Sequence, residues 1–279
     1  MITTPNVKIN LGLNVLRKRE DGFHDLETLF VPYFGISDKL EIVVGDDFSR
    51  TSAAIFGKYA PEMIAQGISE DGKLMITIAR EDGVDWDPLK DLTAKAYQIL
   101  AADFDLPPVK IFLEKTSPVG AGLGGGSSDA AFALKMLDEL CGLGLDEQRL
   151  AEYASRLGSD CAFFIYNRPM IGEGRGEILT EYEIDLDGYD LQVLTPEGVA
   201  VSTKDAYGGI RPHLPEVPLR EALARPVEEW SEVLVNDFEE TVFAKYPELA
   251  AIKRSLYDSG AVYASMSGSG SALFALYGR

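Results

Sequence analysis

Cysteine and histidine are both scarce in this sequence, and their scarcity removes two kinds of site. The only cysteines are Cys141 and Cys161, and they form no C-x-x-C pair, so a disulfide framework is excluded. We expect both to be free, buried thiols of a protein in a reducing compartment. The only histidines, His24 and His213, are too few for a histidine-rich zinc centre.

Long apolar runs and an excess of positive charge are also missing. No stretch approaches the roughly 18 apolar residues of a membrane-spanning helix, and the N-terminal segment lacks the basic and then apolar pattern of a secretory signal. The 26 basic residues are outnumbered by 45 acidic ones, which gives a formal net charge of −19. This charge argues against nucleic acid or an anionic membrane as a partner. We expect a cytoplasmic protein, a monomer or weak homodimer, whose partner is a small molecule.

The pattern of apolar residues predicts an α+β protein. Val7 to Val15 alternate with polar residues, as in a strand with one polar face. Further strands are predicted at 23–34, 38–44, 73–79, 107–115 and 191–196, helices at 88–104, 127–142 and 145–158, and two strands around the SGSGS segment near the C-terminus. Residues 45–70 are left unassigned. The length of 279 residues and a change of texture near residue 170 predict two domains, 1–170 and 171–279.

The segment PVGAGLGGGSSDAA (118–131) carries the clearest chemical signal. Its glycines allow consecutive backbone N–H groups to converge on an anion, because no side chain blocks the approach. A helix follows at once, with Ser127 or Ser128 as its expected N-cap, and its N-terminus favours negative charge. A strand, a glycine turn and a helix N-terminus in this order predict a phosphate-binding site.

Three common designs of phosphate site do not fit this segment. No lysine precedes the serines, as a P-loop requires. A G-x-G-x-x-G match occurs at Gly120, Gly122 and Gly125, but a second helix at 145–158 stands where a dinucleotide fold needs a strand. The protein-kinase motifs are absent as well. The segment therefore indicates a nucleotide-phosphate site of another design.

Three segments together resemble the signature motifs of the GHMP small-molecule kinases. NVKINLGLNV (6–15) resembles the first motif, PVGAGLGGGSSDAA the second and SMSGSGSALFAL (265–276) the third. They occur in the family's order across nearly the whole chain. The turn REDGFH (19–24) further resembles family members that act on a cytidine diphosphate derivative.

The resemblance implies a two-domain GHMP kinase fold, with an N-terminal ribosomal-protein-S5-domain-2-like ATP domain and a C-terminal α/β-plait substrate domain. It implies ATP and Mg²⁺ as cofactors, and phosphorylation of the 2-hydroxyl of a cytidine diphosphate derivative in the non-mevalonate route to isoprenoid precursors. Two alternatives stay open: another GHMP kinase of the homoserine or mevalonate type, and a nucleotide-binding regulator without catalysis. Such a regulator is expected to lose Lys8 or Asp160, and both are present.

By the same resemblance, Asp160 is the catalytic base and Lys8 the lysine that assists it. Judged from its neighbours alone, Asp160 reads as a turn or helix cap after Gly158-Ser159, and Lys8 as part of a solvated strand face. Asn10 shares the face of Lys8, so the two side chains can converge on one ligand.

The resemblance also implies the substrate and nucleotide contacts. Phe23 and Tyr207 would sandwich the cytosine ring, His24 would bind its edge, and Thr203 would lie near the substrate diphosphate. Without the resemblance, Phe23 reads as strand core and His24 as a surface group. The residues implied for ATP are Leu92, Lys115, Pro118, Gly120, Gly122, Leu123, Gly124, Gly125, Gly126, Ser127 and Ser128, with Ser267 to Ser271 as a wall near the phosphates.

At one position the sequence departs from the family. Asp91 precedes Leu92 where relatives usually have asparagine, and an ionised aspartate cannot donate a hydrogen bond to adenine. No carboxylate is assigned to Mg²⁺, because this ion often keeps phosphate and water ligands.

Overall fold

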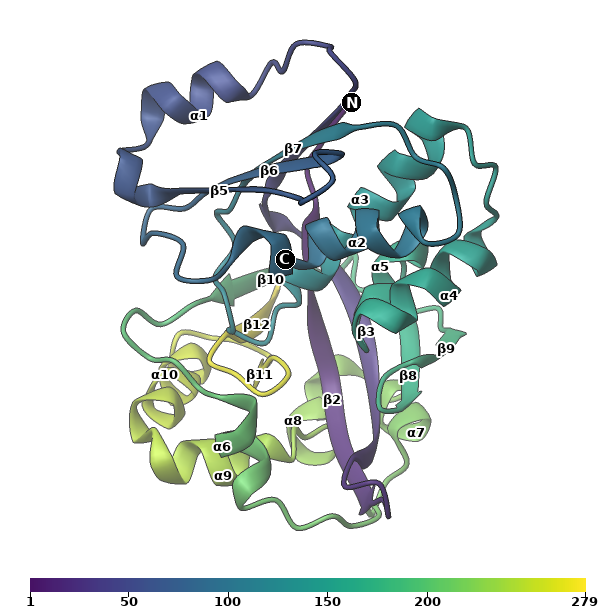
Figure 1. Ribbon diagram of the computed structural model, residues 1–279. Coiled ribbons are helices and arrows are strands. Elements are labelled where there is room, and N and C mark those ends of the chain that lie inside the picture. Colours follow the sequence, from purple (N-terminus) through teal and green to yellow (C-terminus); the bar gives the residue numbers. More distant parts are fainter. The chain divides into compact units, whose positions relative to one another are not determined.

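The computed structural model describes residues 1–279, which divide into two compact units (Figure 1). Unit 1 consists of Met1–Val7, Phe34–Ser117 and Gly124–Asn167, and unit 2 of Lys8–Tyr33, Pro118–Leu123 and Arg168–Arg279. The glycine segment therefore begins in unit 2 and enters unit 1 at Gly124. None of the helices is both long and apolar enough to cross a membrane.

Unit 1 is built on a five-stranded sheet with the order β1-β4-β7-β6-β5. Its strands are β1 (Ile2–Thr3), β4 (Lys39–Val44), β5 (Ile64–Ile68), β6 (Leu74–Ala79) and β7 (Val109–Glu114). Neighbouring strands are antiparallel except β6 and β7, which are parallel and in a register that pairs Ile76 with Ile111. The connection between these two strands contains helix α2 (Leu92–Ala101), as parallel pairs require a crossover.

Side-chain alternation gives this sheet two different faces. One face carries Val43, Ala79 and Phe112, against which Ile55 of α1 (Ser52–Lys58) packs. The opposite face is fully apolar and buried, and α2 and α3 (Gly125–Cys141) pack on it (Figure 1). The side chains of this second face are Leu40, Ile42, Leu74, Ile76, Ile78, Val109, Ile111 and Leu113. The period of two along each strand thus supplies a continuous apolar layer on one face and a smaller apolar cluster on the other.

Two further helices complete unit 1 beside α3. Helix α4 (Glu147–Leu157) is capped by Asp146, which accepts from the backbone N–H of Arg149, and α5 (Cys161–Tyr166) follows it directly. Helix α3 ends at Gly142, which has a φ of 65°. Glycine adopts this left-handed conformation without steric cost, so the chain can turn sharply into α4.

Unit 2 contains two smaller sheets. The first has the order β2-β3-β8-β9, with β2 (Asn6–Lys18), β3 (His24–Ser37), β8 (Met170–Gly174) and β9 (Ile178–Glu181); the first residues of β2 and the last of β3 belong to unit 1. The second has the order β10-β12-β11, with β10 (Tyr189–Leu194), β11 (Tyr263–Met266) and β12 (Leu273–Gly278). The helices are α6 (Thr203–Gly208), α7 (Leu219–Leu223), α8 (Trp230–Val233), α9 (Phe238–Lys245) and α10 (Pro247–Asp258). A shared apolar core joins the three-stranded sheet to α6, α9 and α10.

Several local expectations need correction. The unassigned residues 45–70 form α1, a 3₁₀ turn at Pro61–Met63 and β5. The helix expected at 88–104 starts only at Leu92, because Pro88–Lys90 is a 3₁₀ turn and Asp91 is extended. Helix α5 and the pair β8-β9 were missed, since both are short. The polar face of β2 is buried rather than solvated, because Lys8, Asn10 and Asn14 are at most 5 % exposed.

Candidate active site

In unit 2, the first half of the glycine segment is clamped between the first and third sequence motifs. The backbone N–H of Lys8 on β2 donates to Leu123 O, and that of Ala272 donates to Ala121 O, both at 3.0 Å. These bonds fix the path of residues 121–123 on both sides. Segments more than a hundred positions apart in the sequence therefore form one structure.

The carbonyl oxygen of Gly122 is the point where the three motifs meet. It accepts from the Lys8 ammonium at 2.9 Å and from the Ser267 hydroxyl at 3.0 Å. Gly122 has a φ of 77°, and a Cβ at this residue would lie 2.1 Å from Ser267 O. Only glycine permits this contact.

Lys8 and Asn10 meet as their spacing on β2 predicts. The Lys8 ammonium donates to the Asn10 side-chain oxygen and lies 5.4 Å from the centre of the Phe30 ring. The Asn10 amide in turn donates to the Thr28 hydroxyl at 3.0 Å. Lys8 is only 2 % exposed, and these contacts hold its ammonium in a defined position beside the glycine segment.

In unit 1, the second half of the glycine segment forms the first turn of α3. Gly124 is its N-cap with a φ of 71°, and no side chain caps the helix. The cap expected from Ser127 or Ser128 is wrong, because the helix starts before both residues. The N–H groups of the first turn are thus left without a side-chain cap, as in anion-binding helix termini. Gly126 is exposed, and Leu92 is the nearest side chain to it.

Lys115 does not present its ammonium to the surface. It donates to Asp38 and to Asp129, each at 2.5 Å, and is 6 % exposed. Burial by itself would lower the pKa of Lys115, but the two carboxyl groups outweigh it and raise the pKa above its usual range. A Cβ on Gly125 would lie 2.3 Å from Ser117 Oγ and 3.1 Å from Lys115 Nζ, so α3 starts directly against this cluster.

Asp160 lies at the N-terminus of α5 but does not cap it, since its side chain accepts no hydrogen bond from that helix. The next residue, Cys161, lies near α3, because a Cβ on Gly158 would lie 3.2 Å from Cys161 Sγ and 4.0 Å from Ser127 Oγ. Burial raises the pKa of this thiol to about 12, although the nearby Ser127 hydroxyl opposes the shift. Both thiols are free, but the expected burial of Cys141 is wrong, because this residue is only half-buried. Within unit 1, Asp160 therefore directly precedes a residue that lies near the uncapped first turn of α3.

Asp91 uses both of its carboxylate oxygens inside unit 1. One oxygen accepts from the N–H and hydroxyl of Thr93, at 2.9 and 2.6 Å, and so caps α2. The other accepts from the indole N–H of Trp86 at 3.0 Å. Asparagine offers only one acceptor oxygen, so these contacts account for aspartate at this position.

The aromatic residues implied for the substrate lie in unit 2. The His24 ring stacks on Tyr207 with ring centres 4.8 Å apart, and Tyr207 also meets the edge of Phe238. Phe23 is 54 % exposed, and the Arg175 guanidinium lies 4.9 Å from the centre of its ring. Partial burial, helped by Lys18, lowers the pKa of His24 and keeps it neutral at pH 7. Thr203 is exposed at the start of α6, one turn before Tyr207.

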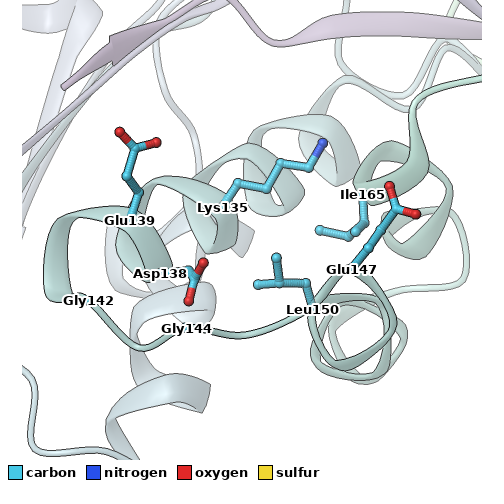
Figure 2. A pocket seen from close by; sticks show the side chains of 8 residues that line it. All are labelled: Lys135, Asp138, Glu139, Gly142, Gly144, Glu147, Leu150 and Ile165. Atoms are coloured by element: carbon cyan, nitrogen blue, oxygen red, sulfur yellow. The ribbon is translucent and has the colours of Figure 1, made fainter.

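A separate pocket of about 590 Å³ lies at the other end of α3 (Figure 2). Leu150 and Ile165 point into it, and three carboxylates, Asp138, Glu139 and Glu147, stand around them. Asp138 accepts from the N–H of Leu145, and Lys135 donates to Phe164 O, so both serve the helix connections. The 17-residue helix places this pocket roughly 20 Å from the glycine turn, and its acidic lining disfavours phosphate.

Family comparisons agree with this geometry. The family model described as GHMP kinases N terminal domain matches residues 91–168, and the model described as GHMP kinases C terminal matches residues 219–279. A relative from Bacteroides fragilis, named 4-diphosphocytidyl-2-C-methyl-D-erythritol kinase, is 46 % identical over 277 residues, which cover 99 % of this chain and 92 % of the relative. A relative of the same name from Cytophaga hutchinsonii is 39 % identical, with the same coverage.

Solved structures show the same architecture. The crystal structure of a 4-(cytidine 5'-diphospho)-2C-methyl-D-erythritol kinase matches with a TM-score of 0.76 and 30 % identity, covering 99 % of this chain and 90 % of that one. A homoserine kinase from Cytophaga hutchinsonii matches with a TM-score of 0.64 and 17 % identity, covering 99 % and 86 %, which is a likeness of fold alone. The two-domain α+β fold expected from the sequence is confirmed.

Proposed function

Because the chain belongs to the GHMP kinase family, we propose that it transfers the γ-phosphoryl group of ATP to the 2-hydroxyl of 4-diphosphocytidyl-2-C-methyl-D-erythritol. This reaction belongs to the non-mevalonate route to isoprenoid precursors. The observation that carries the proposal is the meeting of all three motifs at the carbonyl of Gly122. The free thiols of Cys141 and Cys161 support a cytoplasmic location.

The glycine segment is the proposed site of the ATP phosphates. The N–H groups of the first turn of α3 lack a side-chain cap, and the helix dipole favours an anion there. Gly126 is exposed and Ser127 half-buried in this turn, and Leu92 beside Gly126 suits an apolar contact with the nucleoside. Lys115 lies against Gly125 and donates to Asp129, so it helps to hold this turn in place.

Asp160 is the proposed general base, and Lys8 the group that stabilises developing charge. Asp160 would accept the proton of the substrate hydroxyl while the hydroxyl oxygen attacks the γ-phosphorus and ADP leaves. A fixed ammonium stabilises the negative charge that builds on the transferring group, and Lys8 is held in place by Asn10 and Gly122.

The substrate base is assigned to the aromatic group of unit 2. A neutral His24 can donate to or accept from the cytosine edge, and Tyr207 and Phe23 offer ring faces for stacking. Thr203 lies one helical turn from Tyr207, which suits a contact with the diphosphate.

Mg²⁺ is proposed to arrive with ATP. No group of three or more His, Cys, Asp or Glu side chains is arranged to hold a metal ion. The ion would therefore keep phosphate and water ligands, where it offsets phosphate charge.

An ATP-consumption assay with three alcohols tests the proposal. Purified protein is given ATP, Mg²⁺ and either the cytidyl substrate, mevalonate or homoserine, and ADP release is followed. We expect turnover only with the cytidyl substrate, and turnover about 10²–10⁴ times slower with Asp160→Asn. Turnover of homoserine or mevalonate would assign a different substrate class, and the absence of ADP with all three would favour a regulator.

A further inference from the structure

Three ionisable side chains lie buried beneath the first turn of α3. Asp38 precedes β4, Lys115 follows β7, and Asp129 belongs to α3 itself. Their exposed fractions are 2 %, 6 % and 1 %. Lys115 lies between the two carboxyl groups, and Gly125 packs directly on Lys115 and Ser117.

Asp38 has the contacts of an ionised carboxylate. One oxygen accepts from the backbone N–H groups of Thr116 and Ser117, both at 2.6 Å. The other accepts from the Ser117 hydroxyl at 2.6 Å and from Lys115. Burial would raise the pKa of Asp38, but the ammonium and these hydrogen bonds outweigh it and hold the pKa below its usual range.

Asp129 has the opposite surroundings. Its Oδ2 accepts from Lys115 at 2.5 Å, but its Oδ1 is buried and has no hydrogen-bond partner. The charged groups that act on it are Lys115 from the end of β7, Asp38 beside β4 and Asp91 at the start of α2. One cation thus faces three carboxyl groups, and a charged oxygen without a partner is very costly to bury.

We propose that Asp129 carries a proton on its unpartnered oxygen, so that Asp38, Lys115 and Asp129 form an uncharged floor beneath the first turn of α3. Burial, reinforced by Asp38, raises the pKa of Asp129 well above its usual range despite the nearby ammonium. In this state Asp38 and Lys115 neutralise each other, and the neutral Asp129 still accepts from Lys115 through Oδ2.

The neutral floor has a consequence that rests on the proposed function. Asp129 lies four residues after Gly125, about 6 Å along the helix axis. An uncompensated negative charge at this distance would oppose the binding of a nucleotide polyphosphate at the same turn. Asp129 is thus a positioning residue, which anchors Lys115 and the glycine turn without adding charge.

Infrared spectroscopy of the full chain without nucleotide tests the protonation directly. At pH 7, the wild-type spectrum should contain a carboxylic-acid C=O band that Asp129→Asn lacks. Asp105→Asn is the matched control, because the Asp105 side chain is 97 % exposed, and this variant should keep the band. Identical spectra for wild type and Asp129→Asn in this region would overturn the proposal.

Calorimetry with Mg²⁺ and ADP tests the effect on the nucleotide. Asp129→Asn keeps both the shape and the neutrality of the side chain, so its Kd for ADP should lie within about threefold of wild type. Asp129→Ala removes the partner of Lys115 and should bind ADP about five- to tenfold more weakly. An Asp129→Asn protein that binds roughly tenfold more tightly would show that the native residue is charged. Equal affinities of the Asn and Ala variants would remove the positioning role. If wild type does not bind ADP, the proposed function fails, while the infrared result still decides the protonation.

Discussion

The two buried lysines of the candidate site hold different parts of the glycine segment and the helix turn that follows it. In unit 2, Lys8 donates to an amide oxygen and to the carbonyl of Gly122. In unit 1, Lys115 donates to two carboxyl groups beneath the helix turn. The family resemblance links both residues to the reaction, with Lys8 inside the first motif and Lys115 three residues before the second.

This difference separates two tasks that the sequence alone cannot distinguish. Lys115 has its charge balanced inside the fold, so it suits the support of the glycine turn. Lys8 donates to the Asn10 side-chain oxygen and to Gly122 O, so its ammonium is held directly against the glycine segment, and it suits the stabilisation of a reacting group there. The following predictions test this division, from the largest expected effect to the smallest.

The strongest test compares Asp160→Asn with Lys8→Met in steady-state kinetics. Each change should lower kcat by about 10²–10⁴, with little change in the KM for either substrate, because proton transfer and charge stabilisation act in the transition state. Circular dichroism serves as the control for folding. A kcat close to wild type in Asp160→Asn would show that water, and not Asp160, accepts the proton.

Lys115→Met should act mainly on stability. It leaves two buried carboxyl groups without their shared cation, so the free energy of unfolding in urea should fall by about 3–5 kcal/mol. Lys73→Met removes a lysine from the exposed pair with Asp105 and should change it by less than about 1 kcal/mol. A stable Lys115→Met protein that has lost its turnover would reverse the roles given to the two lysines.

The pH dependence of stability should differ between wild type and Asp129→Asn. Because the folded state raises the pKa of Asp129, it favours the protonated form, and this contribution is complete in acid and lost as the pH rises through the folded pKa. Asp38 acts in the opposite sense, since its lowered pKa gives stability that is lost as the pH falls. Urea unfolding should be measured from pH 4 to 9. Relative to wild type, the free energy of unfolding of Asp129→Asn should rise by about 1–3 kcal/mol between the acid and the alkaline end. Parallel curves would contradict a protonated Asp129.

His24→Ala tests the aromatic group of unit 2. Removing the ring that stacks on Tyr207 should weaken the binding of cytidine diphosphate by about tenfold, while the affinity for ADP stays unchanged. Calorimetry with each ligand separates the two effects. Equal losses for both nucleotides would remove His24 from the substrate base site.

The smallest effect is expected from Asp91→Asn. The variant keeps the helix cap but loses the acceptor of Trp86, so the free energy of unfolding should fall by about 1 kcal/mol. Fluorescence should report a more mobile Trp86, with the buried Trp230 as an unchanged background. An unaltered spectrum would show that the Trp86 contact is not needed to hold the indole.

Local patterns made part of this site predictable. The alternation from Val7 to Val15 placed Lys8 and Asn10 on one face, and their hydrogen bond confirms it. The glycine segment predicted a turn that leads into a helix, and α3 begins there. The N-cap was wrong because Gly124 in a left-handed conformation starts the helix before Ser127. That Asp160 and Lys8 act in catalysis, and that residues 1–170 and 171–279 behave as separate domains, stay predictions.

Non-local contacts account for what the sequence did not reveal. Asp38 lies 77 positions from Lys115 and belongs to no motif, so nothing near it in the sequence indicated its role. The burial of Asp129 and the missing partner of its Oδ1 were equally invisible in the sequence. The stacking of His24 on Tyr207 also joins residues more than 180 positions apart.

The sequence by itself determined the strand, the glycine turn and the helix, because alternation, helical spacing and the freedom of glycine act over a few neighbouring residues. Only the tertiary structure decided that Lys115 lies between two buried carboxyl groups and that one oxygen of Asp129 is buried without a partner. These properties depend on burial and on charges brought together from distant segments, and no local pattern records them.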